Sequence, residues 1–247
     1  MSEPVQVRVF GSDSEDLDLD FDTHDVPSLV TALLARCLRD SAGHARTADH
    51  WWALPLGERI ALLLTILEAG DASDLELVLD CAACAERIEV ALPLRALVEH
   101  QRAARPEVEA RRDGRTIRLR RPTGEDLQRW STELRSGDTA AFVQALIVDG
   151  ERELDAEWLT VIEAALADSD PLVDFKVVTR CPACDAPHEA DVDLQPLICR
   201  RLKGAQSTLL DEIHRLALAY HWSEAELVAM PAGRRGQYLA RLDRLGQ

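Results

Sequence analysis

The sequence predicts an α+β protein, mainly α-helical, in which helices surround two small β-hairpins that carry cysteines. One observation is a repeated pair, Cys81-Ala-Ala-Cys84 and Cys181-Pro-Ala-Cys184. A second is that apolar residues elsewhere recur mostly with the period of a helix. A third is that aromatic residues make up 4% of a chain that is 47% hydrophobic, which fits Leu- and Ala-rich helices better than a β-sandwich.

Each cysteine pair lies between two strand-like runs, at residues 75–79 and 88–92 and at residues 175–178 and 190–194. A two-residue spacer lets two thiolates turn toward one ion, and two such turns supply the four sulfurs that Zn2+ takes in structural sites. We therefore predict a split zinc ribbon made of two CxxC β-knuckles. Its ligands are Cys81, Cys84, Cys181 and Cys184.

Other interpretations of these cysteines stay open. An isolated CxxC is also the signature of a redox dithiol, and two reduced turns could repeat without any metal. His188 follows Cys184 closely and could replace a cysteine as ligand. A redox dithiol is expected at a helix N-terminus, however, whereas both pairs here lie between predicted strands.

The two hairpins resemble each other beyond the cysteines. Residues 77–94 and 176–197 both read as strand, knuckle, strand and then a proline, which has no N–H to continue a ladder. This pattern indicates an internal duplication. It divides the chain into an acidic flexible arm (1–25), an N-terminal helical region (26–74), the split ribbon with a helical insertion (75–203) and a C-terminal helical region (204–247).

Composition limits the classes of partner. The formal net charge of −16 argues against binding mainly through phosphates, which needs clustered Lys and Arg. Arginines do gather at residues 111–121 and near the C-terminus, where they are expected to be solvated or to meet an acidic protein surface. The sequence shows no secretion signal, no membrane span and no disulfide framework, so we expect a cytoplasmic protein. Cys37 and Cys199 are expected to be buried as small hydrophobic residues.

The N-terminal segment is rich in aspartate. After a possible short strand at residues 5–10, so few apolar groups remain that a mobile arm is the default expectation. Leu17, Leu19 and Phe21 alternate with acids, which leaves addition of this segment to a partner's sheet edge as the alternative.

The remaining elements follow from periodicity and capping signals. An Asp113-Gly114 turn predicts a hairpin, and Thr123 with Asp126 predicts a capping box before a helix whose face includes Leu127, Trp130 and Leu134. Asp138 or Thr139 is expected to cap the next helix. The predicted helices span residues 27–40, 56–69, 95–104, 139–148, 155–167, 207–220, a short one from Ser223 with Glu226 as its capping box, and 234–245.

Two stretches carry a resemblance to a known family. Residues 212–227, with Pro231, Arg234-Arg235 and Tyr238-Leu239, resemble the C-terminal signature of baseplate hub and hub-assembly proteins of contractile phage tails and phage-derived injection systems. The segment Arg121-Pro122-Thr123-Gly124-Glu125-Asp126-Leu127 is similar to an "LPTGxDL" segment of that family, with Arg121 replacing its leucine. Two CxxC knuckles occur in its larger members.

The resemblance implies a non-enzymatic structural or assembly (chaperone-like) protein, with other baseplate or tail proteins as partners. It does not extend to the N-terminal region. We expect the partner surface to include Trp222, Arg234, Arg235 and Tyr238, since aromatic and arginine side chains dominate protein interfaces. The alternative function is a zinc-ribbon regulator that binds nucleic acid. For an enzyme, the sequence offers no Ser-His-Asp spacing, phosphate-binding loop or dinucleotide fingerprint.

Overall fold

The computed structural model describes residues 5–22, 25–70, 72–133 and 139–246, and it is a mixed α/β structure with about half of the chain in helices. The helices are α1 (Val26–Cys37), α2 (Ala48–Trp52), α3 (Leu56–Ala69), α4 (Leu94–Gln101), α5 (Gly124–Glu133), α6 (Thr139–Leu146), α7 (Ala156–Ser169), α8 (Leu194–Tyr220), α9 (Glu224–Ala229) and α10 (Ala232–Leu245), with a 3-10 helix, η1 (Ser14–Asp18). The strands are β1 (Gln6–Val7), β2 (Leu38–Arg39), β3 (Asp74–Asp80), β4 (Arg87–Pro93), β5 (Glu107–Arg112), β6 (Arg115–Arg120), β7 (Ile147–Asp149), β8 (Lys176–Arg180) and β9 (Pro187–Asp191).

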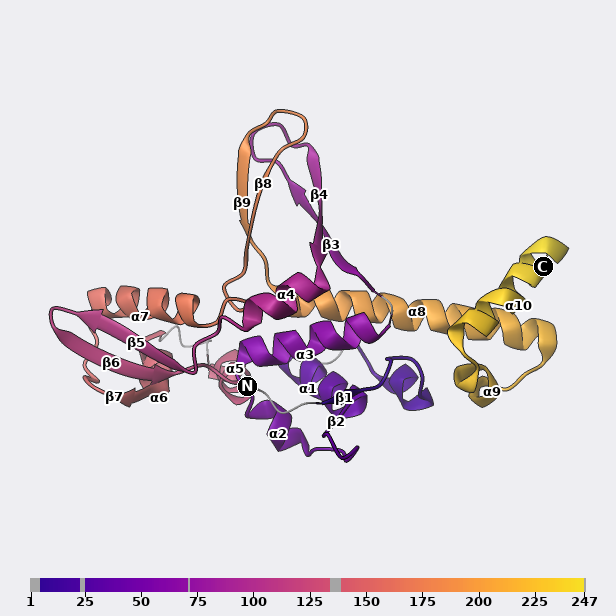
Figure 1. Ribbon diagram of the computed structural model, residues 1–247, viewed down its shortest axis with the longest axis horizontal. Coiled ribbons are helices and arrows are strands. Elements are labelled where there is room, and N and C mark those ends of the chain that lie inside the picture. The colour runs from indigo at the N-terminus through magenta and orange to yellow at the C-terminus, as the bar shows by residue number, and fades with distance from the viewer. Residues whose placement is uncertain (1–4, 23–24, 71, 134–138, 247) are drawn as a thin grey trace.

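The molecule is an elongated body from which one arm projects (Figure 1). The long helix α8 runs along the body beside α1 and α3. At one end lie β5, β6 and β7 with α6 and α7, and at the other end lie α9 and α10. The arm consists of two hairpins, β3–β4 and β8–β9, whose tips meet far from the body.

The core of the body is built from the apolar stripes of α1, α3 and α8. Leu33, Leu34, Leu63, Leu64 and Ile198 are fully or almost fully buried there. The leucine periodicity of residues 27–40 and 56–69 predicted these buried faces, because residues three and four apart lie on one side of a helix. The core therefore joins segments from the N-terminal and C-terminal regions of the sequence.

Both predicted hairpins of the arm are present, each as a separate antiparallel pair. In the first, Asp80 pairs with Arg87 beside the knuckle, and in the second Arg180 pairs with Pro187. Within the described residues the two hairpins share no strand ladder, so they form two sheets and not one continuous ribbon. Two-stranded sheets of this size are marginally stable alone, so the link between their tips matters.

The two halves of the chain share more of their element order than the sequence indicated. Helix α3 and helix α7 have bounds that differ by 100 in residue number, as do the knuckle cysteines and the first residues of α4 and α8. Each copy thus reads helix, hairpin, helix. The packing of the two halves differs, since α3 packs against α4 whereas α7 packs against β5.

The insertion between the hairpins is not purely helical. Its Asp113-Gly114 turn has positive φ at both residues, 50° and 77°, and closes the predicted β5–β6 hairpin. The expected helix at 139–148 ends at Leu146, and Ile147–Asp149 instead pairs with β6. The β-branched Ile147 and Val148 favour a strand, and this edge pairing lets Ile147 join the core of that sheet. Leu134 and Asp138 lie outside the described residues.

Residues 5–22 differ from the flexible arm that composition predicted. Leu19 is 4% exposed within the main core, and the Gln206 side-chain amide donates hydrogen bonds to the carbonyls of Asp16 and Leu19 at 2.8 and 3.0 Å. Asp16 is fully buried and accepts two hydrogen bonds from Arg8, at 2.6 and 2.7 Å. Because its charge is paired, the acidic tract can pack, and η1 replaces the alternative of an extended strand.

The boundary expected at residue 204 falls inside α8, which is continuous for 27 residues from Leu194. Pro196 was expected to break the chain after the hairpin. It lies instead in the first helical turn, where a missing N–H leaves no intrahelical bond unmade. The hairpin therefore passes directly into the longest helix.

A buried polar cluster joins the base of the arm to the insertion. The Asp170 carboxylate, 2% exposed, accepts hydrogen bonds from the Gly57 amide at 3.2 Å and from the Gln101 side chain at 2.7 Å. The Arg121 guanidinium lies 3.5 Å from the same carboxylate and 2.6 Å from that of Glu58. Four segments thus meet at the Asp170 carboxylate: the start of α3, the end of α4, the segment before α5 and the end of α7.

Two helix starts meet through a short backbone bridge. The Leu56 amide donates to the Pro122 carbonyl at 3.0 Å, and the Gly124 amide donates to the Leu54 carbonyl at 3.2 Å. The predicted capping box is present, since the Asp126 carboxylate accepts from the Thr123 amide at 2.9 Å. The family-like segment 121–127 is therefore part of the packing of the body.

In the part of the chain that the structure describes, no helix combines the length and the apolar character needed to cross a membrane.

Truncation of Leu19 tests the packing of the N-terminal segment. We expect Leu19→Ala to lower the free energy of unfolding by about 2–5 kcal/mol, because it leaves a cavity in the main core. Leu218, which is 66% exposed, provides the control, and Leu218→Ala should change stability by less than about 0.5 kcal/mol. Urea denaturation measures both. Equal, small effects would show that residues 5–22 do not pack on the core.

Substitution of Gly57 tests the Asp170 cluster. A Cβ atom at Gly57 would lie 1.8 Å from Asp170 Oδ1, so Gly57→Ala should destabilise the fold by on the order of 3 kcal/mol. Gly204 lies inside α8, and a Cβ atom added there would have no neighbour within 4 Å, so Gly204→Ala should stabilise the protein by about 0.5–1 kcal/mol. Opposite signs in thermal or urea unfolding are the expected result.

Candidate metal centre

The four cysteines of the two knuckles come together at the tip of the arm. Their sulfur atoms all lie within 4.8 Å of one another, and the four residues form the one such cluster among the described residues. Two of the sulfur–sulfur contacts cross between the hairpins. Cys81 Sγ lies 3.8 Å from Cys184 Sγ, and Cys84 Sγ lies 3.6 Å from Cys181 Sγ.

These separations fit a tetrahedral ion. Four sulfurs placed about 2.3 Å from one centre form a tetrahedron with edges of about 3.8 Å. A disulfide would need about 2.05 Å, and all four cysteines are free thiols here. The cluster could therefore hold a metal ion with four sulfur ligands. An ion bound in this way has no coordination position left for water.

The backbone of the two knuckles is nearly identical. The Cys81 amide donates to the Glu86 carbonyl at 2.9 Å and the Cys181 amide to the Ala186 carbonyl at 3.0 Å. The residue after each second cysteine, Ala85 or Asp185, has a left-handed φ of 59° or 57°. Such conformations are unfavourable for residues with a Cβ atom and persist where the surroundings require them.

Hydrogen bonds from backbone amides to its sulfur atom favour the thiolate form of Cys81. Amide hydrogen bonds from Ala83 and Cys84 lower the pKa of Cys81 to about 7. At Cys84 the Glu86 amide lowers the pKa, but the neighbouring thiols of Cys184 and Cys181 raise it more, to about 12. Four thiolates this close together repel one another, so full ionisation of the set requires a cation.

The cluster is half enclosed. Cys81 and Cys181 are 4% and 2% exposed and pack with Ile88, whereas Cys84 and Cys184 face solvent. Exposure of two ligands gives an ion a path of entry. The described residues place neither His188 nor any other side chain in the ligand set.

The other two cysteines are separate from this centre. Cys37 and Cys199 are buried in the main core, as predicted, and burial raises the pKa of each to about 12. They are neutral packing residues.

The four residues expected at a partner surface lie at the α9–α10 end but are not equivalent. Trp222 and Tyr238 contact each other, with ring centroids 4.8 Å apart, and both are half-buried beside Tyr220. Arg234 is exposed. Arg235 is 8% exposed and donates to Glu212 at 3.0 Å and to the Met230 carbonyl, so its contacts are those of a packing residue.

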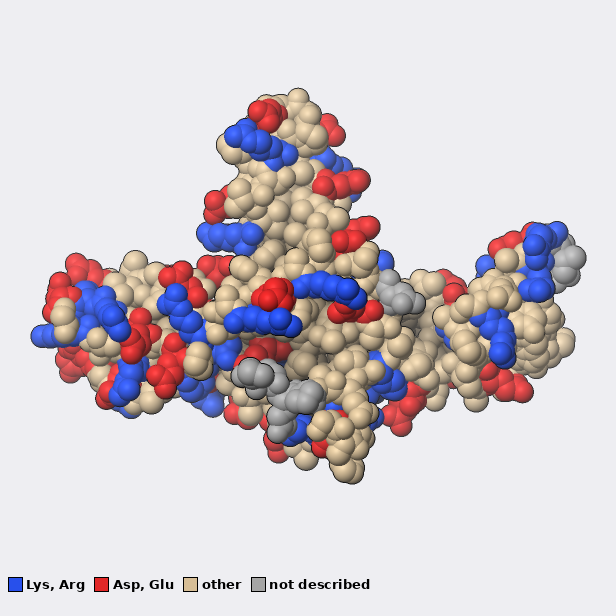
Figure 2. Space-filling model, viewed as in Figure 1, with Lys and Arg blue, Asp and Glu red and all other residues tan. Residues whose placement is uncertain are grey.

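The arginine-rich hairpin is electrically balanced. Each of its six arginines pairs with a carboxylate, for example Arg115 with Glu151 at 3.0 Å and Arg118 with Asp149 at 2.7 Å. The remaining pairs are Arg111–Glu109, Arg112–Asp155, Arg120–Asp126 and Arg121–Glu58. Figure 2 shows acidic and basic side chains interleaved over this end of the molecule.

The cysteine spacing predicts the ligands but not the residues that shape the two knuckles. These are Ala83 and Cys84, whose amides donate to sulfur, and Ala85 and Asp185, which have a left-handed backbone. The available signal was the parallel between the two copies, since Ala85 and Asp185 occupy the same position in each.

No family model matches this chain, and neither the curated proteins nor the solved structures contain a match.

Replacement of one ligand tests the centre. We expect the purified protein to carry about one metal ion per chain, and Cys181→Ser to lose it, because three sulfurs cannot complete the sphere. Cys199→Ala, which removes a thiol outside the cluster, should retain the ion. Elemental analysis by mass spectrometry measures the metal in protein prepared without chelator. A metal-free parent protein would contradict a metal site.

Proposed function

We propose that this chain is a non-enzymatic structural or assembly (chaperone-like) protein of the baseplate hub of a contractile phage-tail-like particle, with a structural Zn2+ in its arm. The observation that carries the proposal is the resemblance of residues 121–127 and of the C-terminal stretch to that protein family. The protein would be built into such a particle or act on it during assembly.

The choice of Zn2+ rests on the chemistry of the ligands. The four cysteine sulfurs lie within 4.8 Å of one another, and a set of four sulfur ligands is typical of structural zinc sites, which bind no substrate at the metal. The ion would hold together two hairpins that share no strand ladder in the described residues. Its role would be mechanical, since it closes a chain segment of about a hundred residues.

The proposed partner surface is the α9–α10 end. Tyr220, Trp222 and Tyr238 form one aromatic group there, and Arg241 lies over the Tyr238 ring at 5.7 Å from its centroid. Exposed Arg234 adds a second positive charge on the same helix. Aromatic side chains flanked by arginines are the residues that most often anchor protein interfaces.

Nucleic-acid binding is the weaker alternative. It needs arginines that are free to meet phosphates, but all six in the β5–β6 hairpin are paired with carboxylates and the chain carries a net charge of −16. We therefore favour protein partners.

Charge reversal tests the proposed surface. We expect Arg234→Glu with Arg241→Glu to reduce co-purification of the tagged chain with baseplate proteins by about tenfold or more, because both anchors change sign. Arg235 is kept, since its contacts support the fold. Pull-down from cells that assemble contractile particles, followed by mass spectrometry, is the measurement.

The matched control is a double reversal on another exposed face. Arg95 in α4 and Arg102, which directly follows α4, have 89% and 74% exposed side chains, and Arg95→Glu with Arg102→Glu should leave co-purification unchanged. Failure of the parent chain to recover any baseplate or tail protein would contradict the proposed function itself. Equal recovery by both double variants would contradict only the location of the surface.

A further inference from the structure

The cysteine cluster contains two accessible sulfur atoms and two enclosed ones. Cys84 and Cys184 are exposed, whereas Cys81 and Cys181 are buried. Each exposed sulfur lies beside a buried sulfur of the other hairpin: Cys84 Sγ is 3.6 Å from Cys181 Sγ. Cys184 Sγ is 3.8 Å from Cys81 Sγ. An accessible thiol can react first with an oxidant, and a neighbouring thiol can then form a disulfide with it.

Both contacts between the hairpins are close to the geometry of a covalent bond. A disulfide joins sulfur atoms about 2.05 Å apart, so the sulfur atoms of each contact need to approach by less than about 2 Å. The residues between the cysteines of each knuckle, Ala82, Ala83, Pro182 and Ala183, are exposed and have short side chains. The knuckles therefore have room for this movement.

We propose that hydroperoxides convert the metal-free cluster into two disulfides that cross between the hairpins and keep the tip of the arm closed. One bond joins Cys84 to Cys181, and the other joins Cys184 to Cys81. The two hairpins share no strand ladder in the described chain, so these bonds would take over the joining of their tips. The inference rests on the cysteine cluster and does not depend on the proposed baseplate function.

Each bond forms in two steps. The exposed thiol attacks one oxygen of the hydroperoxide, the O–O bond breaks, and the products are a sulfenic acid and one molecule of water or alcohol. The buried thiol of the other hairpin then attacks the sulfenic sulfur, and the hydroxyl group leaves as water with the proton of that thiol. Two thiols are thus oxidised by two electrons, and one hydroperoxide is reduced.

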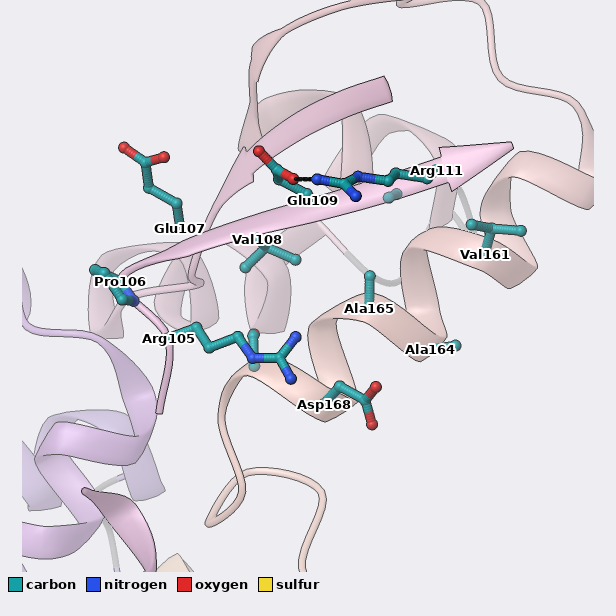
Figure 3. A pocket seen from close by; sticks show the side chains of 12 residues that line it. Arg105, Pro106, Glu107, Val108, Glu109, Arg111, Val161, Ala164, Ala165 and Asp168 are labelled. Atoms are coloured by element: carbon teal, nitrogen blue, oxygen red, sulfur yellow. Dashed lines mark hydrogen bonds and ion pairs between the residues drawn. The ribbon is translucent and has the colours of Figure 1, made fainter. Parts of the chain in front are cut away.

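The other cavities and sulfur atoms do not offer the same reaction. The groove of about 610 Å3 between β5 and α7 is lined by charged and apolar side chains, and its described lining residues include no cysteine or methionine (Figure 3). Met230 lines a second cavity, but a thioether forms a sulfoxide and no disulfide. Cys37 and Cys199 are buried in the main core. Disulfide formation is therefore expected at the arm alone.

Disulfide mapping of the full chain tests the pairing. The chain is freed of metal with a chelator, oxidised with hydrogen peroxide, alkylated under denaturing conditions and digested with trypsin without reductant. Trypsin releases the first knuckle in peptide 60–87 and the second in peptide 181–200. We expect mass spectrometry to find the two peptides joined, with Cys199 alkylated.

Two results of this mapping would overturn the proposal. Separate peptides that each contain an internal disulfide would show that each knuckle closes on itself and that oxidation does not join the hairpins. A disulfide-linked dimer in a non-reducing gel would show that the bonds form between chains. If the purified chain carries no metal, the chelator is omitted and the mapping is otherwise the same, so the result is independent of the metal's identity.

Two matched variants compare the contact between hairpins with the pair inside one knuckle. Cys81→Ser with Cys184→Ser keeps Cys84 and Cys181, whereas Cys181→Ser with Cys184→Ser keeps Cys81 and Cys84. Each variant loses two sulfur ligands, so both are matched for loss of the ion. We expect the first variant to lose maleimide-reactive thiol in hydrogen peroxide at least ~10-fold faster. Equal rates, or a faster second variant, would contradict the proposed pairing.

Hydrogen exchange tests whether the oxidised tip stays closed. Exchange is compared among the metal-loaded chain, the chelated reduced chain and the chelated oxidised chain. We expect the amides of β3, β4, β8 and β9 to exchange at least ~10-fold faster in the chelated reduced chain than in the other two. Dithiothreitol should restore fast exchange to the oxidised chain. Fast exchange that persists after oxidation would show that the disulfides do not hold the arm closed, and the proposal would be wrong.

Discussion

The buried carboxylate of Asp170 is the interaction on which the arrangement of the body depends. It receives hydrogen bonds from Gly57 and Gln101 and lies beside the Arg121 guanidinium, so it fixes four helix or strand ends that are far apart in sequence. A buried charge is stable only when such partners are present, and loss of one leaves the others unsatisfied. The four segments are therefore held together because each supplies either the Asp170 carboxylate or one of the groups that compensate its charge.

The cysteine cluster at the tip of the arm offers a second point at which the same chain could be fixed. One strand of each hairpin is connected to the Asp170 cluster, since β4 leads into α4, which ends at Gln101, and β8 follows α7, and the two hairpins meet again at the four cysteines. With an ion bound by the four cysteines, the insertion would be attached at two places, by the Asp170 cluster at the base of the arm and by the sulfur atoms at its tip. Two attachments fix an orientation, whereas one would permit rotation.

The features that the sequence predicted are mostly those determined by residues close to one another in the chain. Each cysteine knuckle and the Asp113-Gly114 turn were predictable because spacing of a few residues determines their geometry. The meeting of the two knuckles is a long-range contact, and it was predictable because each pair supplies half of a four-sulfur ligand set. The Asp170 cluster was not, because its partners come from three separate segments. Pro196 is ambiguous by nature, since a residue without an N–H suits both the end of a ladder and the first turn of a helix.

The N-terminal segment shows why composition alone was insufficient. An acid-rich tract is expected to stay solvated because its charges lose hydration on burial. Asp16 escapes this rule through Arg8, which precedes the tract and donates two hydrogen bonds to it, and Leu19 can then enter the core.

The body and the arm differ in how many apolar side chains they bury. The core of α1, α3 and α8 is large and apolar, and the four cysteines lie outside it at the tip of the arm, so an ion bound there would add little to this core. The arm has little such support, because its two sheets are two-stranded and only Cys81, Ile88 and Cys181 are buried near the tip. A metal ion would therefore control the geometry of the arm more than the stability of the protein.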